Sequence, residues 1–160
     1  MVWATAKSVR EERSKQRCAL QDFSHIRASL IKGKSGWRIA SVESYGNYFL
    51  QAHSRIQRGM VTFVTAQLRR YVHGESLLPK IYEDAFEVLS DKNDVTEKND
   101  SLQEVFSVRL LAELGYIAPS PVWAHVVEAK SIKDALEVYS KDMSPAIESA
   151  IQEGVQASHL

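Results

Sequence analysis

Apolar residues change their spacing near residue 46 of the chain. Residues 23–31 alternate between two faces, residues 32–36 hold two glycines, and residues 37–42 resume an extended pattern. Two such runs joined by a short glycine-containing loop predict a β-hairpin. We therefore expect residues 1–43 to fold as short strands.

From about Asn47 onward, apolar residues recur every three or four positions, which is the spacing of one face of an α-helix. Pro79 is typical of the first turn of a helix and predicts a second one. The chain is therefore predicted to be α+β, with a small β module over residues 1–45 and a helical domain over residues 46–160. The stripe that predicts the first long helix is formed by Phe49, Ala52, Ile56, Met60, Phe63, Val64, Leu68 and Tyr71.

Local capping signals predict where the later helices begin and end. Ser101 and Glu104 have the spacing of a capping box, and Gly115 is a candidate C-terminal stop for the same helix. Ser131 and Ser144 are candidate N-caps of two closing helices. In the core of the helical domain we expect Phe49, Ile56, Phe63, Leu68, Phe86, Phe106, Leu110 and Leu114.

A net charge of zero conceals a split between the two halves of the chain. Residues 1–70 hold thirteen lysines and arginines against four acidic residues, whereas residues 71–160 hold seven against sixteen. A basic segment of this strength predicts a polyanionic partner. The alternative is that the two halves attract each other within one molecule.

Composition argues against several classes of protein. Cys18 is the only cysteine, so neither an internal disulfide nor a multi-cysteine zinc site is expected. No run approaches the roughly 18 apolar residues of a membrane span, and the first residues lack the pattern of a signal peptide. We therefore expect a soluble protein of a reducing compartment.

Residues 28–35 (ASLIKGKS) fit a relaxed phosphate-binding loop, in which Lys34 would reach the phosphates and Ser35 a magnesium ion. That chemistry needs a helix after the loop, whereas residues 36–42 predict a strand. The five histidines show no ligand spacing. We predict no catalytic residue, metal or cofactor, and a nucleotide hydrolase built on Gly33, Lys34 and Ser35 is the weaker alternative.

Cationic side chains remain as the candidate chemistry of the β module. Lysine and arginine neutralise a phosphate backbone, and aromatic rings between them stack on unpaired bases. For Trp37, beside the glycine loop, a place in the core of the sheet is an equally good expectation. The candidate DNA-binding residues are Lys7, Arg10, Arg13, Lys15, Arg17, Lys32, Lys34, Trp37 and Arg38.

Residues 6–43 (AKSVREERSKQRCALQDFSHIRASLIKGKSGWRIASVE) resemble the basic strand, loop and hairpin of the bacterial recombination mediator family RecO. A second landmark, residues 105–119 (VFSVRLLAELGYIAP), is similar to the Phe-Glu-x-Arg-Leu-Leu-x-x-Leu-Gly-Tyr-x-Pro helix of that family. Gly74 and Glu75, after the first long helix, fit the family pattern as well. The resemblance covers roughly residues 4–120.

The resemblance implies a partial OB-like β-barrel followed by an α-helical domain, in a cytoplasmic, nucleoid-associated protein without enzymatic activity. It implies binding of single- and double-stranded DNA, annealing of complementary strands and assistance in loading recombinase. The implied partners are RecR and the C-terminal tail of single-stranded-DNA-binding protein, and no membrane is involved. DNA contact carries over to the basic loop (Lys7, Arg10, Arg13, Lys15 and Arg17) and to the hairpin (Lys32, Lys34 and Arg38).

Two departures from the family pattern bear on this expectation. The family barrel has about two further strands before the segment that matches residues 4–9, so either the true start lies upstream and completes the barrel, or the barrel is incomplete and has an unpaired edge. Many relatives carry a four-cysteine zinc cluster after the Leu-Gly-Tyr helix, whereas residues 117–130 hold no cysteine. A competing hypothesis, from another functional class, is a protein-interaction module whose basic half docks an acidic partner chain without binding DNA.

Overall fold

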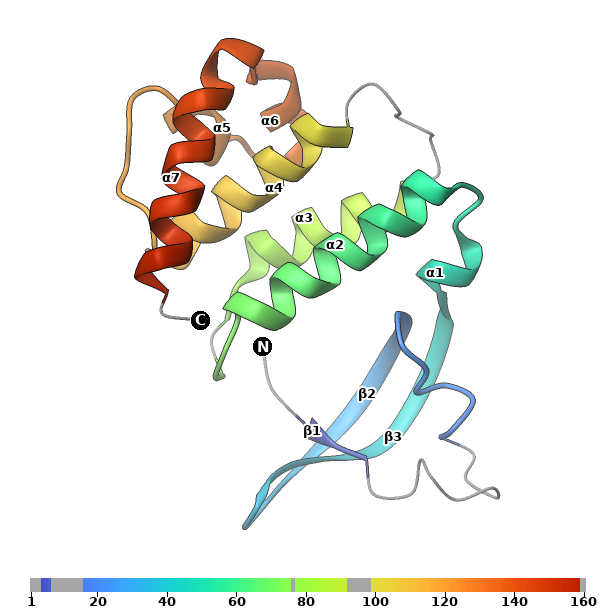
Figure 1. Ribbon diagram of the computed structural model, residues 1–160. Coiled ribbons are helices and arrows are strands. Elements are labelled where there is room, and N and C mark those ends of the chain that lie inside the picture. The colour runs from blue at the N-terminus through green and yellow to red at the C-terminus, as the bar shows by residue number, and fades with distance from the viewer. Residues whose placement is uncertain (1–3, 7–15, 76, 92–98, 159–160) are drawn as a thin grey trace.

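A small sheet followed by a layer of helices makes up the chain in the computed structural model, which describes residues 4–6, 16–75, 77–91 and 99–158 (Figure 1). The predicted α+β class is confirmed. The change from strand to helix falls between Asn47 and Tyr48. The strands are β1 (Ala4–Thr5), β2 (Ser24–Gly33) and β3 (Gly36–Asn47).

The predicted hairpin is confirmed, and it forms most of the sheet. β3 lies in the centre, antiparallel to β2 on one side and parallel to the short β1 on the other. Lys34 and Ser35 form the turn between the paired Gly33 and Gly36, and Gly36 has a φ of 102°, which favours glycine. Within the described residues these strands form an open sheet, and they do not close into a barrel.

Seven α-helices and one 3₁₀ helix are described after the sheet. In the described part of the chain, no helix is both long and apolar enough to span a bilayer. Their bounds are α1 (Tyr48–Gln51), α2 (Arg55–Tyr71), α3 (Pro79–Ser90), α4 (Asn99–Glu113), α5 (Ala124–Glu128), α6 (Ile132–Val138), η2 (Lys141–Met143) and α7 (Ser144–Ala157).

Helix α4 is the centre of the hydrophobic core, because every residue from Val105 to Leu111 is buried. It packs against α2 and α3 on the side of the sheet and against α6 and α7 on the other side (Figure 1). Phe106 and Leu110 are buried, as predicted, at 1% and 0% exposure. Phe63, Leu68 and Leu114 are partly buried and pack against this core.

Other members of the predicted core lie elsewhere. Phe86 is 43% exposed, so its assignment to the core is wrong. Phe49 and Ile56 are half-buried and lie outside the main core. The Phe49 ring stacks on Phe23, with 5.2 Å between centroids, and so closes the junction between the sheet and the first helix.

The predicted first long helix is interrupted, and the break has a local cause. Ser54 accepts a hydrogen bond from the backbone N–H of Gln57 at 3.1 Å, and the Gln57 side chain accepts one from the backbone N–H of His53 at 2.7 Å. This capping arrangement starts α2 at Arg55 and separates it from the short α1.

Two predicted N-caps are wrong, because in both cases the helix begins earlier than predicted. Helix α4 already begins at Asn99, so Ser101 lies inside it. Ser144 is the first residue of α7, and its hydroxyl donates to Glu104 at 3.0 Å instead of capping a helix. Glu104 also accepts from the Tyr139 hydroxyl at 2.7 Å, so its carboxylate links α4 to the closing helices. The predicted starts at Pro79 and after Ser131 are confirmed.

Candidate nucleic-acid interface

Lys32 and Trp37 form a cross-strand pair near the turn of the hairpin. The Lys32 ammonium lies 5.2 Å from the centroid of the Trp37 ring, within the range of a cation–π interaction. The Trp37 side chain is half-buried, and the Lys32 side chain is 63% exposed. The structure therefore brings together a cation and an aromatic ring that the sequence placed five residues apart.

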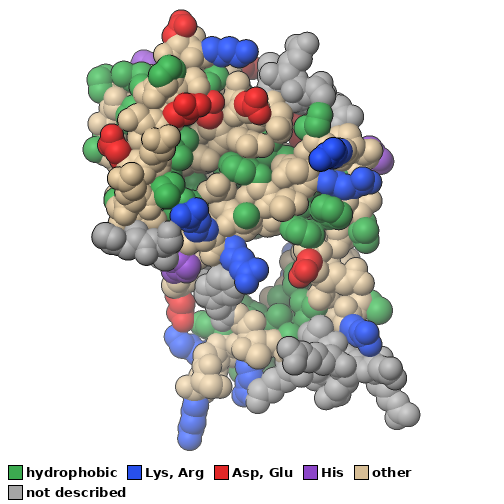
Figure 2. Space-filling model, viewed as in Figure 1, with side chains coloured by type: hydrophobic (Ala, Val, Ile, Leu, Met, Phe, Trp, Pro, Cys, Tyr) green, Lys and Arg blue, Asp and Glu red, His purple; other side chains and the backbone are tan. Residues whose placement is uncertain are grey.

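Lys34 and Arg38 occupy the same end of the hairpin. Lys34 is exposed in the turn, and Arg38 is exposed on β3 opposite Ile31. Neighbouring cross-strand pairs point to opposite faces of a sheet, so Arg38 and Lys32 project from different faces. Among the described residues, neither Lys34 nor Arg38 has an ion-pair partner. Lysine and arginine side chains gather at this end of the molecule in Figure 2, below a hollow between the sheet and the helical layer.

Glu75, in the connection between α2 and α3, contacts this hairpin end. The Trp37 indole Nε1–H donates to Glu75 Oε1 at 2.7 Å, and the Lys32 ammonium lies 3.3 Å from the same oxygen. The hydrogen bond from Trp37, with the one from Lys32, holds the pKa of the Glu75 carboxyl below its ordinary value. Glu75 was not predicted to be part of the site, because it lies 43 positions from Lys32 along the chain.

The basic loop is described only at its end. Arg17 is exposed, and the side chain of its neighbour Gln16 donates to the Ala40 carbonyl at 3.1 Å, which anchors this turn beside the middle of β3. Lys7, Arg10, Arg13 and Lys15 lie outside the described residues, so their predicted role stays a prediction.

An aromatic cluster at the opposite end of the hairpin was not predicted. His25 on β2 lies 5.2 Å from Tyr45, 5.4 Å from Tyr48 and 5.5 Å from Phe86, measured between ring centroids. Tyr82 stacks on Phe86 and is 66% exposed. Only the exposure of these rings distinguishes them from core residues, and exposure is set by the packing of α3 against the sheet.

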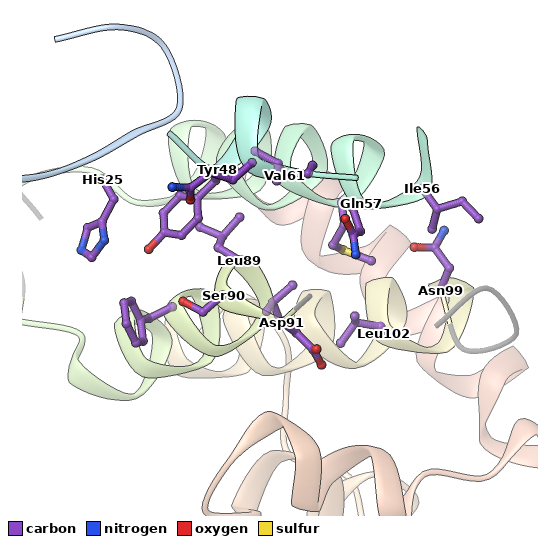
Figure 3. Close-up of a pocket in the computed structure, with 15 residues that line it drawn as sticks. His25, Tyr48, Ile56, Gln57, Val61, Leu89, Ser90, Asp91, Asn99 and Leu102 are labelled. Atoms are coloured by element: carbon purple, nitrogen blue, oxygen red, sulfur yellow. The ribbon is translucent and has the colours of Figure 1, made fainter. Parts of the chain in front are cut away.

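This cluster borders a cavity of about 250 Å³ between α1, α2, α3 and the start of α4. His25, Tyr48 and Ser90 lie together at one end of the cavity, and Asn99 and Leu102 lie at the other end (Figure 3). Burial raises the pKa of the Tyr48 phenol, and a hydrogen bond with Ser90 offsets part of that rise. The lining is mainly apolar and aromatic.

The alternative phosphate-binding loop lacks its required geometry. Lys34 and Ser35 form a hairpin turn, and β3 begins at Gly36, so no helix N-terminus follows them. Within the described residues, no group of three or more histidine, cysteine, aspartate and glutamate side chains is placed to hold a metal ion.

Comparison of the chain with protein-family models, with curated proteins and with solved structures gives no match. The resemblance to the recombination mediator family therefore rests on the sequence landmarks alone.

Proposed function

We propose that this chain is a DNA-binding protein of the recombination-mediator type, which holds nucleic-acid backbones on its basic β module. Phosphate neutralisation by lysine and arginine releases condensed counterions, which supplies binding energy independent of sequence. Two strands whose charges are neutralised in this way approach each other and pair more readily. The proposal includes single- and double-stranded DNA as ligands and the RecR-like and tail-peptide partners that the resemblance implies.

One observation carries the proposal. Lys34 and Arg38 are exposed at the hairpin end without an ion-pair partner among the described residues, and Trp37 is paired with Lys32 at the same end, on the face opposite to Arg38. Cations that track a backbone, combined with an aromatic ring that stacks on a base, are the usual elements of a single-strand binding surface. The aromatic cluster around His25 is left out of this surface, because the Tyr45 hydroxyl donates to the Glu43 carboxylate there and the exposed Glu83 follows Tyr82.

The same proposal interprets the open sheet as part of an OB-like barrel. A long, twisted hairpin with a third strand along one edge is compatible with such a module. The hairpin has two register shifts, between His25 and Ile26 and between Ser29 and Leu30, and β-bulges at such positions are frequent at the rims of barrels, which supports this interpretation.

A second candidate function, docking of an acidic protein chain, is favoured by the contact with Glu75. In that contact Lys32 and Trp37 both donate to a carboxylate oxygen, and the carboxylates of an acidic chain offer the same acceptors. The two candidates differ in which polyanion binds more tightly at the same ionic strength.

A competition experiment separates them. A fluorescein-labelled oligothymidylate is bound to the protein at low salt, and unlabelled oligothymidylate, unlabelled DNA of mixed sequence or an acidic peptide is added as competitor. We expect both DNA sequences to compete equally and the peptide to compete poorly. Stronger competition by the peptide, or no binding of the oligonucleotide at low salt, would favour the protein-docking function.

A further inference from the structure

Two donors from the hairpin converge on one carboxylate oxygen. Trp37 Nε1 lies 2.7 Å and Lys32 Nζ 3.3 Å from Oε1 of Glu75, and Lys32 Nζ is also 3.4 Å from Oε2. A cation and a neutral N–H donor aimed at the same point form a site for an anionic oxygen. A phosphate oxygen of nucleic acid has the same charge and hydrogen-bonding capacity as this carboxylate oxygen.

We propose that Glu75 is a built-in competitor for nucleic-acid phosphate at Lys32 and Trp37, and that binding of a strand displaces it. This inference rests on the proposed function and adds its regulation. The free protein then has two classes of cation at the hairpin end. Lys34 and Arg38 are available at once, whereas Lys32 and Trp37 become available only after Glu75 leaves.

The surroundings of Glu75 favour exchange over a permanent contact. The Glu75 and Lys32 side chains are 54% and 63% exposed, and ion pairs as exposed as this contribute little to stability. Glu75 follows Gly74, which has a φ of 80° and lies outside any helix. The carboxylate thus belongs to a connection outside the helices, and its contacts with the hairpin are the hydrogen bonds from Trp37 and Lys32.

Displacement also changes what Trp37 offers. While Glu75 is bound, the indole N–H is occupied and Lys32 lies over the ring. A phosphate that takes the place of Glu75 can use the same two donors, and an adjacent base would then stack on the part of the half-buried ring that Lys32 leaves open. Phosphate contact and base stacking would thus occur together, which favours single strands over duplex DNA at this position.

The substitution E75Q tests the proposal, with E137Q as the matched control. Both changes remove one negative charge, but Glu137 lies on α6, at the far end of the helical layer from the hairpin (Figure 1). We expect E75Q to tighten oligothymidylate binding about two- to fivefold, the effect of removing a weak competing ion pair. E137Q should change it by about 1.5-fold or less, since α6 lies away from the hairpin and salt screens a remote exposed charge.

A double variant tests whether the gain acts through Lys32. In a K32M background, E75Q should lose most of its effect, because the cation for which Glu75 competes is absent. An undiminished gain in K32M would overturn the competitor role and indicate a general charge effect. A gain in E75Q no larger than that in E137Q, or a loss of affinity, would overturn it as well.

The indole N–H signal of Trp37 in a ¹H–¹⁵N spectrum, identified by its absence in W37F, gives an independent measurement. We expect oligonucleotide addition to shift this signal in the unmodified protein, because a phosphate oxygen replaces the Glu75 carboxylate as the acceptor of the indole N–H. Binding that leaves the signal unmoved would overturn the displacement of Glu75 and leave the proposed function intact. No binding by either protein at low salt would overturn both proposals.

Discussion

Arg109 and Asp84 form a two-pronged ion pair in the interior of the helical layer. Arg109 Nε donates to Asp84 Oδ2 at 2.7 Å, and a second guanidinium nitrogen donates to Oδ1 at 3.0 Å. Both side chains are almost completely buried, at 1% and 2% exposure. This pair joins the middle of α3 to the middle of α4.

The remaining guanidinium nitrogen of Arg109 donates hydrogen bonds to backbone carbonyls at the C-terminal end of α5. It donates to the carbonyl oxygens of Val126, Val127 and Ala129, at 2.7, 3.3 and 3.1 Å. The ammonium of Lys80 also donates to the Val127 carbonyl. The last carbonyls of a helix lack partners within it, so Arg109 serves as a C-terminal cap for α5.

We predict that D84N will unfold far more easily than the unmodified protein. The substitution leaves Arg109 as a buried charge without its counter-ion, which typically costs about 3–5 kcal/mol. Urea unfolding followed by circular dichroism measures the loss. K133Q, which removes the exposed ion pair between Lys133 and Glu87, is the control and should cost about 1 kcal/mol or less. Equal losses in the two variants would contradict the structural role of the buried pair.

We predict a large loss of stability for L110A. Leu110 is fully buried in α4, and truncation of a core leucine typically costs about 2–5 kcal/mol. Leu77, which is 94% exposed before α3, provides the matched control, and L77A should change the free energy of unfolding by about 0.5 kcal/mol or less. A melting curve for L110A that coincides with that of L77A would show the helix to be oriented differently.

Features that depend on neighbouring residues were predictable from the sequence. The hairpin follows from alternation and two glycines, and Pro79 correctly marks the start of α3. Gly115 ends α4 because it adopts a φ of 75° and because the backbone N–H of Tyr116 reaches the Leu111 carbonyl. Ser54 and Gln57 form another local capping signal. It was overlooked because the apolar spacing continues across it and predicts one continuous helix.

Features that depend on packing were not predictable in the same way. Phe86 has the spacing of a core residue, yet α3 turns it toward His25 and the surface. The Glu75 contact joins the two halves, which is the mutual attraction that charge counting offered as an alternative. The charge split predicted that the basic and acidic halves could attract each other. It did not predict that Glu75 would contact Lys32 and Trp37, because that pairing depends on the tertiary arrangement.

We predict that the contact between Glu75 and the hairpin will weaken at acid pH, when the carboxylate becomes protonated. Because the pKa of the Glu75 carboxyl is below its ordinary value of 4.5 in the folded protein, the contact is complete above that value. Its contribution to stability is lost as the pH falls through the lower, folded pKa. We expect the Trp37 indole N–H signal to titrate with a midpoint below 4.5 and this transition to vanish in E75Q. A transition that persists in E75Q would assign it to another carboxyl group.

The salt dependence of DNA affinity tests the central claim most directly. The logarithm of the affinity for a labelled oligothymidylate is plotted against the logarithm of the salt concentration for K34A/R38A and for K130A/K141A. Both variants lose two cations, but Lys130 and Lys141 are exposed in the helical part, away from the hairpin. We predict that K34A/R38A will flatten the slope by up to about 0.7 per lost phosphate contact, with folding unchanged, and that K130A/K141A will keep it. Equal slopes for the two variants and the unmodified protein would contradict DNA binding by the basic hairpin.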